Sequence, residues 1–245
     1  MKDNNKLFSL FDQFAYTQNH ASAFSNMLDF FLMAFKRHDA QQDRLKALEL
    51  LTTHPKREQL VALYAEIGEL SEGFHDPLGQ LFEQRISNGR KGQFFTPEPL
   101  TEFMARSMGI DSLLPKQTVC DPACGSGRML LAVAKINRHL HFYGADIDVV
   151  CCKMAVINMV LNSLTGEIAH MDTLANEFFK GYKTGTVLKD GYHYPCFAEF
   201  SDPNESYIWL RPIDSKESTA FDAPFIPTKS PLMSSGVQGS LFDLS

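Results

Sequence analysis

The stretch QTVCDPACGSG, residues 117–127, runs from a short apolar segment into a turn that carries two closely spaced glycines. Apolar residues at helical spacing follow it, and a second apolar segment, residues 141–145, ends at Asp146-Ile147-Asp148. Glycine accepts positive φ and has no Cβ, so the backbone of such a turn can come close to a ligand. An acidic residue that ends the next parallel strand can accept hydrogen bonds from ribose hydroxyls. The pattern predicts a Rossmann-like α/β fold with a crevice for a nucleoside cofactor.

A simpler interpretation is that Gly125 and Gly127 only make a tight turn between a strand and a helix. Short Gly-x-Gly pairs are common, and the context of an apolar strand before and an apolar helix after favours the cofactor interpretation. The spacing lacks the Gly-x-Gly-x-x-Gly of dinucleotide folds and the Gly-Lys-Ser/Thr of P-loops, which disfavours NAD and ATP.

The whole chain has the composition of a globular protein. It has 245 residues, of which 44% are hydrophobic, and no apolar run reaches the ~18 residues of a membrane span. The N-terminus gives no convincing secretion signal, and the five cysteines suit small buried side chains in a reducing cytoplasm. No Cys-x-x-Cys pair is present, which disfavours zinc, and we expect no metal. A net charge of -6 gives no support for DNA binding by this chain alone.

The first part of the chain, up to about residue 88, reads as helices with aromatic and leucine stripes that are typical of a bundle core. A polar, glycine-bearing segment, residues 85–92, is either a solvated linker or a basic loop near DNA phosphates. Thr96 precedes Pro97 and Glu98 as an N-cap would before a helix running to residue 108. A further helix is expected over residues 149–161 and a third strand over residues 168–170, after which the pattern dissolves near Ala175.

Two motifs resemble those of a known family. Asp121-Pro122-Ala123-Cys124-Gly125-Ser126-Gly127 looks like the S-adenosylmethionine motif of adenine-N6 DNA methyltransferases, and Gly92-Gln93-Phe94-Phe95-Thr96-Pro97 resembles a signature of the modification subunits of type I restriction enzymes. The resemblance covers roughly residues 75 to 175. It implies a Rossmann-like S-adenosylmethionine-dependent methyltransferase fold, complete or incomplete, behind a helical N-terminal region.

The resemblance also implies roles for individual residues. Asp146 would hold the ribose hydroxyls, Asp172 the adenine amine, and the backbone around Gly125 the amino-acid part of S-adenosylmethionine, although Met171 replaces a glycine of the family's pattern. The implied cofactor-binding residues are Gln93, Phe95, Thr96, Asp121, Ala123, Gly125, Gly127, Asp146 and Asp172.

The family's catalytic tetrapeptide, Asn/Asp/Ser-Pro-Pro-aromatic, is missing. It accepts the hydrogens of the base amine and stacks on a flipped base. At the expected distance stands Tyr194-Pro195-Cys196-Phe197, which keeps Pro195 and the aromatic Phe197 but has Tyr194 in place of the acceptor. A weaker candidate is the segment from Asp222 to Phe225, which follows no apolar strand.

The end of the chain, from Asp202 onward, is polar and punctuated by prolines, which indicates a loop-rich tail. Within it, Gln238, Leu241 and Phe242 resemble a short peptide by which bacterial proteins dock on the sliding clamp; the alternative is that the apolar pair packs on its own domain. We therefore expect a helical region (1–91), a methyltransferase-like domain (92–200) and a tail (201–245).

Two functions remain open from the sequence. The first is a cytoplasmic adenine-N6 DNA methyltransferase of the type I modification class, working on DNA through a separate specificity or partner subunit. The second is a catalytically silent relative that keeps the cofactor fold as a binding or scaffold module. Methylation of a protein or a small molecule is disfavoured, because residues 92–97 point to the DNA-modifying branch.

Overall fold

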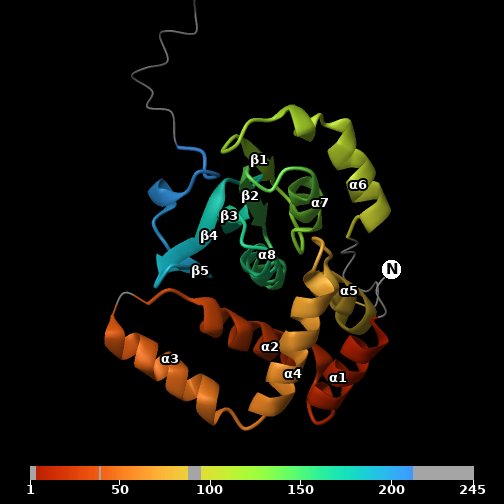
Figure 1. Ribbon diagram of the computed structural model, residues 1–245, viewed down its shortest axis with the longest axis vertical. Coiled ribbons are helices and arrows are strands. Elements are labelled where there is room, and N and C mark those ends of the chain that lie inside the picture. Colours follow the sequence, from red (N-terminus) through yellow and green to blue (C-terminus); the bar gives the residue numbers. More distant parts are fainter. Residues whose placement is uncertain (1–3, 39, 88–94, 212–245) are drawn as a thin grey trace, which may run out of the picture. The chain divides into compact units, whose positions relative to one another are not determined.

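The computed structural model describes residues 4–38, 40–87 and 95–211. Residues up to Leu210 make one compact unit, in which five helices precede a mixed α/β region (Figure 1). The helices are α1 (Asn5–Ala15), α2 (His20–Phe35), α3 (Gln41–Thr53), α4 (Arg57–Ser71), α5 (Pro77–Phe82), α6 (Glu98–Ser107), α7 (Arg128–Ile136) and α8 (Val149–Leu161). None of the described helices is long and apolar enough to span a bilayer.

The sheet has five strands in the order β1-β2-β3-β4-β5. β1 (Thr118–Asp121), β2 (His141–Asp146) and β3 (Thr165–Asp172) are parallel, so their acidic last residues reach the same edge of the sheet. The helices α7 and α8 connect these strands, as the sequence predicted. The predicted Rossmann-like α/β fold behind a helical N-terminal region is confirmed.

The prediction that the pattern dissolves near Ala175 is wrong. β4 (Glu177–Lys189) and β5 (Tyr192–Phe200) form a long antiparallel hairpin that adds to β3. Asp190 (φ 52°) and Gly191 (φ 80°) form its two-residue turn, in which both residues have positive φ. Asp-Gly between two strands is the residue pair that such a turn prefers, and it was the available sequence signal for the hairpin.

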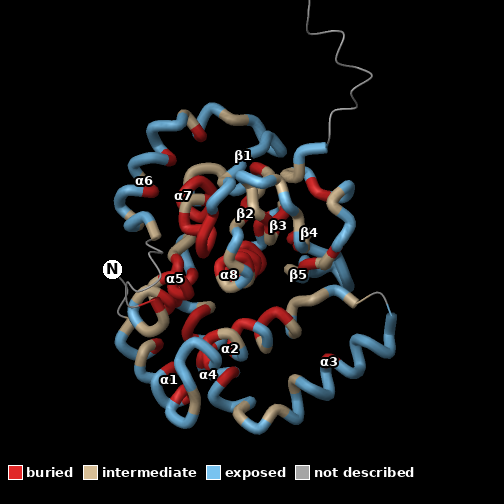
Figure 2. The backbone as a smooth tube through the Cα atoms, turned by 180° about the vertical axis from the view of Figure 1, so that it is seen from behind, coloured by how far each residue is buried: buried red, intermediate tan, exposed pale blue. Residues whose placement is uncertain are grey.

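α8 lies at the centre of this unit. It begins where the Asp148 side chain accepts a hydrogen bond from Val150 N (2.8 Å), and nine of its thirteen residues are buried. α8 packs against the sheet on one side and against α2, α4 and α5 on the other. A helix that is apolar nearly all round belongs in a core, and α8 joins the N-terminal helices to the sheet as one hydrophobic core (Figure 2).

The other face of the sheet carries a smaller apolar cluster. Ala145, Ala169 and Met171 are buried there beneath Phe178, Ile208 and Trp209. Ser206 Oγ donates a hydrogen bond to Glu167 Oε1 (2.5 Å) on β3 and so fixes the segment that crosses this face. The chain after β5 therefore returns across β3 toward β2, where the Tyr207 ring contacts that of Tyr143 (5.6 Å between centroids).

We predict that Ile157→Ala on α8 destabilises the protein by about 2–5 kcal/mol, because the lost side chain leaves a cavity between the helices and the sheet. Urea unfolding followed by circular dichroism measures the free energy of unfolding. The control Leu48→Ala removes a side chain that is 55% exposed on α3, and its effect is expected to stay within about 0.5 kcal/mol. Equal effects for the two variants would contradict the central position of α8.

Candidate functional site

The glycine turn between β1 and α7 takes the backbone conformation that its sequence predicts. Gly125 has φ 55° and Gly127 has φ 83°, which is the left-handed region that other residues rarely adopt. A Cβ on Gly125 would lie 2.8 Å from the ring of Phe95, and one on Gly127 would lie 3.3 Å from the Cβ of Ala155 on α8. Both glycines are therefore required for close packing as well as for backbone conformation.

Asp146 joins the glycine turn to the end of β2. Its Oδ2 accepts a hydrogen bond from Gly125 N (2.9 Å), and its Oδ1 accepts one from Asp148 N (2.8 Å) at the start of α8. Cys124 N also donates to Ala145 O (2.8 Å). Each carboxylate oxygen can accept more than one hydrogen bond, so Asp146 retains acceptor capacity toward a ligand.

Asp121 and Asp172 lie at the same edge, at the ends of β1 and β3. Asp121 Oδ1 accepts from Ala123 N (3.1 Å). Burial raises the pKa of Asp121, the hydrogen bond from Ala123 opposes this, and the charge of Asp146 adds to the rise. Asp172 Oδ1 accepts from Leu174 N (2.9 Å) and Ala175 N (3.0 Å), which fixes the turn after β3. The three carboxylates predicted from the sequence are thus gathered along one edge.

A small hollow of about 80 Å³ lies beside the glycine turn. Of the residues that the resemblance implied, it is lined by Phe95, Thr96, Asp121, Ala123 and Gly125. Pockets that enclose a drug-sized ligand measure about 300–1,000 Å³. The hollow therefore has room for only one end of a nucleoside cofactor, and the remainder would lie over the open edge at Asp146, where the next residue, Ile147, is 63% exposed.

One aromatic contact and one cationic contact hold Phe95 against this turn. Its ring lies 5.6 Å from that of Phe82 between centroids, and the guanidinium of Arg128 lies 5.5 Å from its centroid. Arg128 Nη1 also donates to the carbonyl of Thr96 (3.1 Å).

The predicted N-cap role of Thr96 is wrong, because α6 begins after Pro97 and has no side-chain cap. Gln93 lies outside the described residues.

A buried polar cluster under the turn was not predicted. We call it the Asp76 cluster, and it consists of Asp76, Ser126, Arg128 and Asn158. Asp76 Oδ2 accepts from Ser126 Oγ (2.5 Å) and Arg128 Nε (2.9 Å), while Asp76 Oδ1 accepts from Asn158 Nδ2 (2.8 Å) and Gly79 N (2.8 Å). Arg128 Nη2 reaches Glu83 Oε2 (3.0 Å) as well. The cluster ties α5, the glycine turn and α8 together.

One signal in the sequence could have pointed to this cluster. Arg128 is the first residue of α7, where the positive end of the helix dipole disfavours a cation. An arginine in that position therefore needs a nearby anion, but the sequence does not reveal that Asp76, 52 residues earlier, is that anion.

The candidate acceptor Tyr194-Pro195-Cys196-Phe197 does not lie at this site. These residues belong to β5, at the opposite edge of the sheet from β1, which at ~4.8 Å per strand places them roughly 19 Å from β1. The Phe197 ring is 1% exposed and packs on Tyr182, so it cannot stack on a base. This corrects the assignment of Tyr194, Pro195 and Phe197. Asp222, Phe225, Gln238, Leu241 and Phe242 lie outside the described residues.

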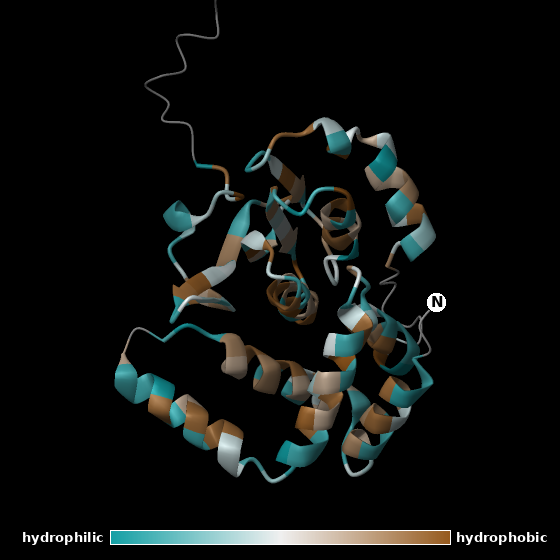
Figure 3. Ribbon diagram, in the orientation of Figure 1, coloured by the Kyte–Doolittle hydropathy of each residue, from teal (hydrophilic) through white to brown (hydrophobic). Residues whose placement is uncertain are grey.

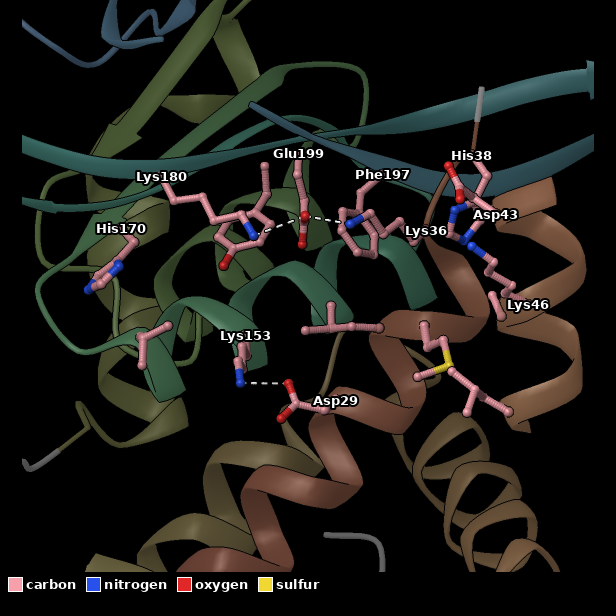
Figure 4. Close-up of a pocket in the computed structure, with 16 residues that line it drawn as sticks. Asp29, Lys36, His38, Asp43, Lys46, Lys153, His170, Lys180, Phe197 and Glu199 are labelled. Carbon is pink, nitrogen blue, oxygen red and sulfur yellow. Dashed lines mark hydrogen bonds and ion pairs between the residues drawn. The ribbon is translucent and has the colours of Figure 1, made fainter. Parts of the chain in front are cut away.

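A larger hollow, of about 590 Å³, lies along α8 between α2, α3 and the β4–β5 hairpin (Figure 4). Figure 4 shows Glu199 between Lys36 and Lys180, and their amines lie 2.5 and 2.9 Å from it. Burial alone would raise the pKa of Glu199, but the hydrogen bonds from the two lysines outweigh it and lower that pKa. This central carboxylate is already neutralised, and the hollow does not include the glycine turn.

Comparisons with known proteins agree with the family resemblance of the sequence motifs. Residues 75–192 match the family model of the N-6 DNA methylases. The methylase subunit of the type I restriction enzyme MpnII from Mycoplasma pneumoniae is 26% identical over 206 residues, which cover 78% of this chain and 37% of that protein. The MjaVII methylase subunit from Methanocaldococcus jannaschii is 24% identical over 169 residues, which cover 61% of this chain and 29% of that protein.

A solved structure of a putative class I S-adenosylmethionine-dependent methyltransferase from Listeria monocytogenes is 15% identical, covers 67% of this chain and 52% of that chain, and has a TM-score of 0.42. The chain is similar to methylase subunits of type I restriction enzymes, and it spans about a third of the length of these two curated relatives.

We predict that Asp76→Ala lowers the free energy of unfolding by about 3–5 kcal/mol, because it leaves the buried Arg128 with one carboxylate partner fewer. The control Glu102→Ala breaks an exposed ion pair with Lys135 and is expected to cost less than about 1 kcal/mol. Both are measured by urea unfolding, and a cost for Asp76→Ala no larger than that of the control would refute the role of the cluster.

Proposed function

We propose that this chain binds S-adenosylmethionine at the glycine turn and serves adenine-N6 methylation of DNA, as a cytoplasmic protein that resembles the methylase subunit of type I restriction enzymes. The observation that carries the proposal is the contact of Asp146 with Gly125, which brings the acidic strand end and the glycine turn together. The family match over residues 75–192 and the type I relatives support the reaction class.

The residues present fit this cofactor. Asp146 would accept hydrogen bonds from the ribose hydroxyls, Asp172 would accept from the adenine amine, and the backbone of Gly125 would receive the amino-acid end in the hollow beside Phe95. When bound, the cofactor supplies an activated methyl group. The protein's own contribution is to orient the cofactor, because its carboxylates are already fixed by backbone N–H groups of the adjoining turns.

A second function, a cofactor-binding scaffold without catalysis, is favoured by one observation. Within the described part of the chain, the candidate acceptor residues stand in β5, roughly 19 Å from β1. DNA contact would then depend on a partner, such as a specificity subunit, and a sliding-clamp contact through residues 238–242 remains a proposal from the sequence.

We predict that the full chain binds S-adenosylmethionine and its demethylated product, and that Asp146→Asn weakens this binding at least tenfold. An amide keeps one acceptor oxygen but cannot accept from both ribose hydroxyls and both backbone amides as the carboxylate can. Isothermal titration calorimetry measures the affinity, with Glu102→Gln on α6 as the control and circular dichroism to show that both variants are folded. Unchanged affinity in Asp146→Asn would place the cofactor elsewhere.

A methyl-transfer assay distinguishes the methylase function from the scaffold function. The methylase function predicts incorporation of labelled methyl groups into mixed-sequence DNA, with loss of incorporation in Asp146→Asn. The scaffold function predicts cofactor binding in the titration and no incorporation by the chain alone. Incorporation that persists in Asp146→Asn would contradict both.

A further inference from the structure

The turn between β3 and β4 carries Asp172, one of the carboxylates that would contact the cofactor. Its Oδ1 accepts hydrogen bonds from the backbone N–H groups of Leu174 (2.9 Å) and Ala175 (3.0 Å). In the described part of the chain nothing bonds its Oδ2, which leaves this oxygen for a ligand. The position of Oδ2 therefore depends on what holds the turn.

Asn176 closes this turn and connects it to a distant part of the chain. Its φ is 54°, a left-handed conformation that asparagine adopts more readily than most residues. Its side chain accepts a hydrogen bond from Leu210 N (3.0 Å) and donates one to Leu210 O (2.8 Å). Its carbonyl accepts another from Trp209 Nε1 (3.1 Å). Both backbone groups of Leu210 and the indole of Trp209 thus bind the end of the turn.

Residues 206–210, which we call the crossing segment, are themselves fixed on β3. Ser206 Oγ (2.5 Å) and Tyr207 N (3.1 Å) donate to the two carboxylate oxygens of Glu167, which is 1% exposed. A buried carboxylate must be hydrogen-bonded, so the crossing segment has one place on the sheet. Figure 3 shows the chain as hydrophilic at the short helix Pro203–Glu205 and more hydrophobic beyond it, where it returns to the sheet.

Trp209 also covers the residue that departs from the family's pattern. Met171 stands where the resemblance has a glycine, and its side chain is 2% exposed in the apolar cluster beneath Trp209. The indole thus packs its apolar part on this cluster and donates its N–H to Asn176, as an aromatic ring with one polar group does in a core. The turn is held by this packing as well as by hydrogen bonds.

The other side of the turn is tied to the glycine turn. Thr173 Oγ1 donates to Pro122 O (3.1 Å), the carbonyl just before Ala123. The β3–β4 turn is therefore held at Thr173 toward β1 and at Asn176 toward the crossing segment. Asp172 lies directly before these two anchors, so both contribute to its position relative to the glycine turn.

We propose that Asn176 and Trp209 are positioning residues for adenine recognition. They hold the β3–β4 turn so that Asp172 Oδ2 accepts from the amine of the cofactor's adenine, and they thereby make the site select adenine over a base without that amine. A carboxylate can only accept hydrogen bonds, so a carbonyl oxygen in place of the amine leaves two acceptors facing each other. This assignment rests on the proposed function for the ligand, whereas the contacts that hold the turn do not.

The test compares two ligands that differ at one group: S-adenosylhomocysteine, the demethylated product, and S-inosylhomocysteine, which has a carbonyl oxygen in place of the amine. Isothermal titration calorimetry with the full chain measures both affinities. We expect the wild-type chain to prefer the adenine compound about tenfold or more, which is the value of a hydrogen bond to a charged group. Asn176→Gly removes the side chain and accepts the positive φ without strain, and it is expected to reduce the preference to about threefold or less.

Two further variants separate positioning from general stability. Trp209→Phe keeps a ring over Met171 but removes the Nε1 donor, and it is expected to give a preference between those of the wild type and Asn176→Gly. Asn162→Ala is the matched control, because it removes an amide-to-carbonyl hydrogen bond (2.9 Å, to Asn158 O) at the end of α8 opposite Asp148. It is expected to leave the preference unchanged. A merely structural role of Asn176 would weaken the binding of both compounds equally and keep their ratio.

Hydrogen exchange, followed by mass spectrometry without ligand, tests the hold on the turn itself. The amides of Leu174 and Ala175 donate to Asp172, so they are expected to exchange about tenfold faster in Asn176→Gly than in the wild type. An unchanged preference or unchanged exchange in Asn176→Gly would overturn the inference and leave the proposed function intact. Equal affinity of the wild-type chain for the two compounds would also overturn it. A folded wild-type chain that binds neither compound would instead refute the proposed function, and the adenine role with it.

Discussion

The carboxylate of Asp76 is the group on which the architecture of the site depends. It is fully buried, and it receives hydrogen bonds from α5, the glycine turn, α7 and α8. A buried charge is tolerated only when it is paired and hydrogen-bonded, so each of these elements must keep its place. The turn that would bind the cofactor is therefore fixed from beneath by the N-terminal helices. The N-terminal helices therefore support the site directly and pack as part of the same unit.

The same network determines how Phe95 reaches the site. Arg128 contacts Asp76 and Glu83, and its remaining donor group holds the carbonyl of Thr96 while its plane lies over the ring of Phe95. One arginine thus links the buried carboxylate to the residue that covers Gly125. A guanidinium suits this position because it presents several donors in a fixed plane and also packs on aromatic rings.

The sheet separates the candidate acceptor residues from the edge that carries the three carboxylates. Its strands extend from β1 in one direction only, toward a hairpin whose aromatic Phe197 belongs to the core. The carboxylates that would orient a cofactor lie at the ends of β1, β2 and β3. On the other side of β1, its residues Thr118 and Cys120 are exposed, and so are the large apolar side chains of α6.

The sequence by itself determined the local structure around the cofactor site. The conformation of Gly125 and Gly127, and the position of the aspartates at the ends of three strands, follow from adjacent residues. The glycine turn, the shared acidic edge and the helices α6, α7 and α8 could therefore be predicted. Only the tertiary structure decided which distant groups meet. The pairing of Asp76 with Arg128 spans 52 residues, and the position of Tyr194 in β5 depends on a hairpin that adds to the far side of the sheet. The outward apolar side of α6 also emerged only from the packing, because a hydrophobic stripe predicts burial without saying which partner buries it.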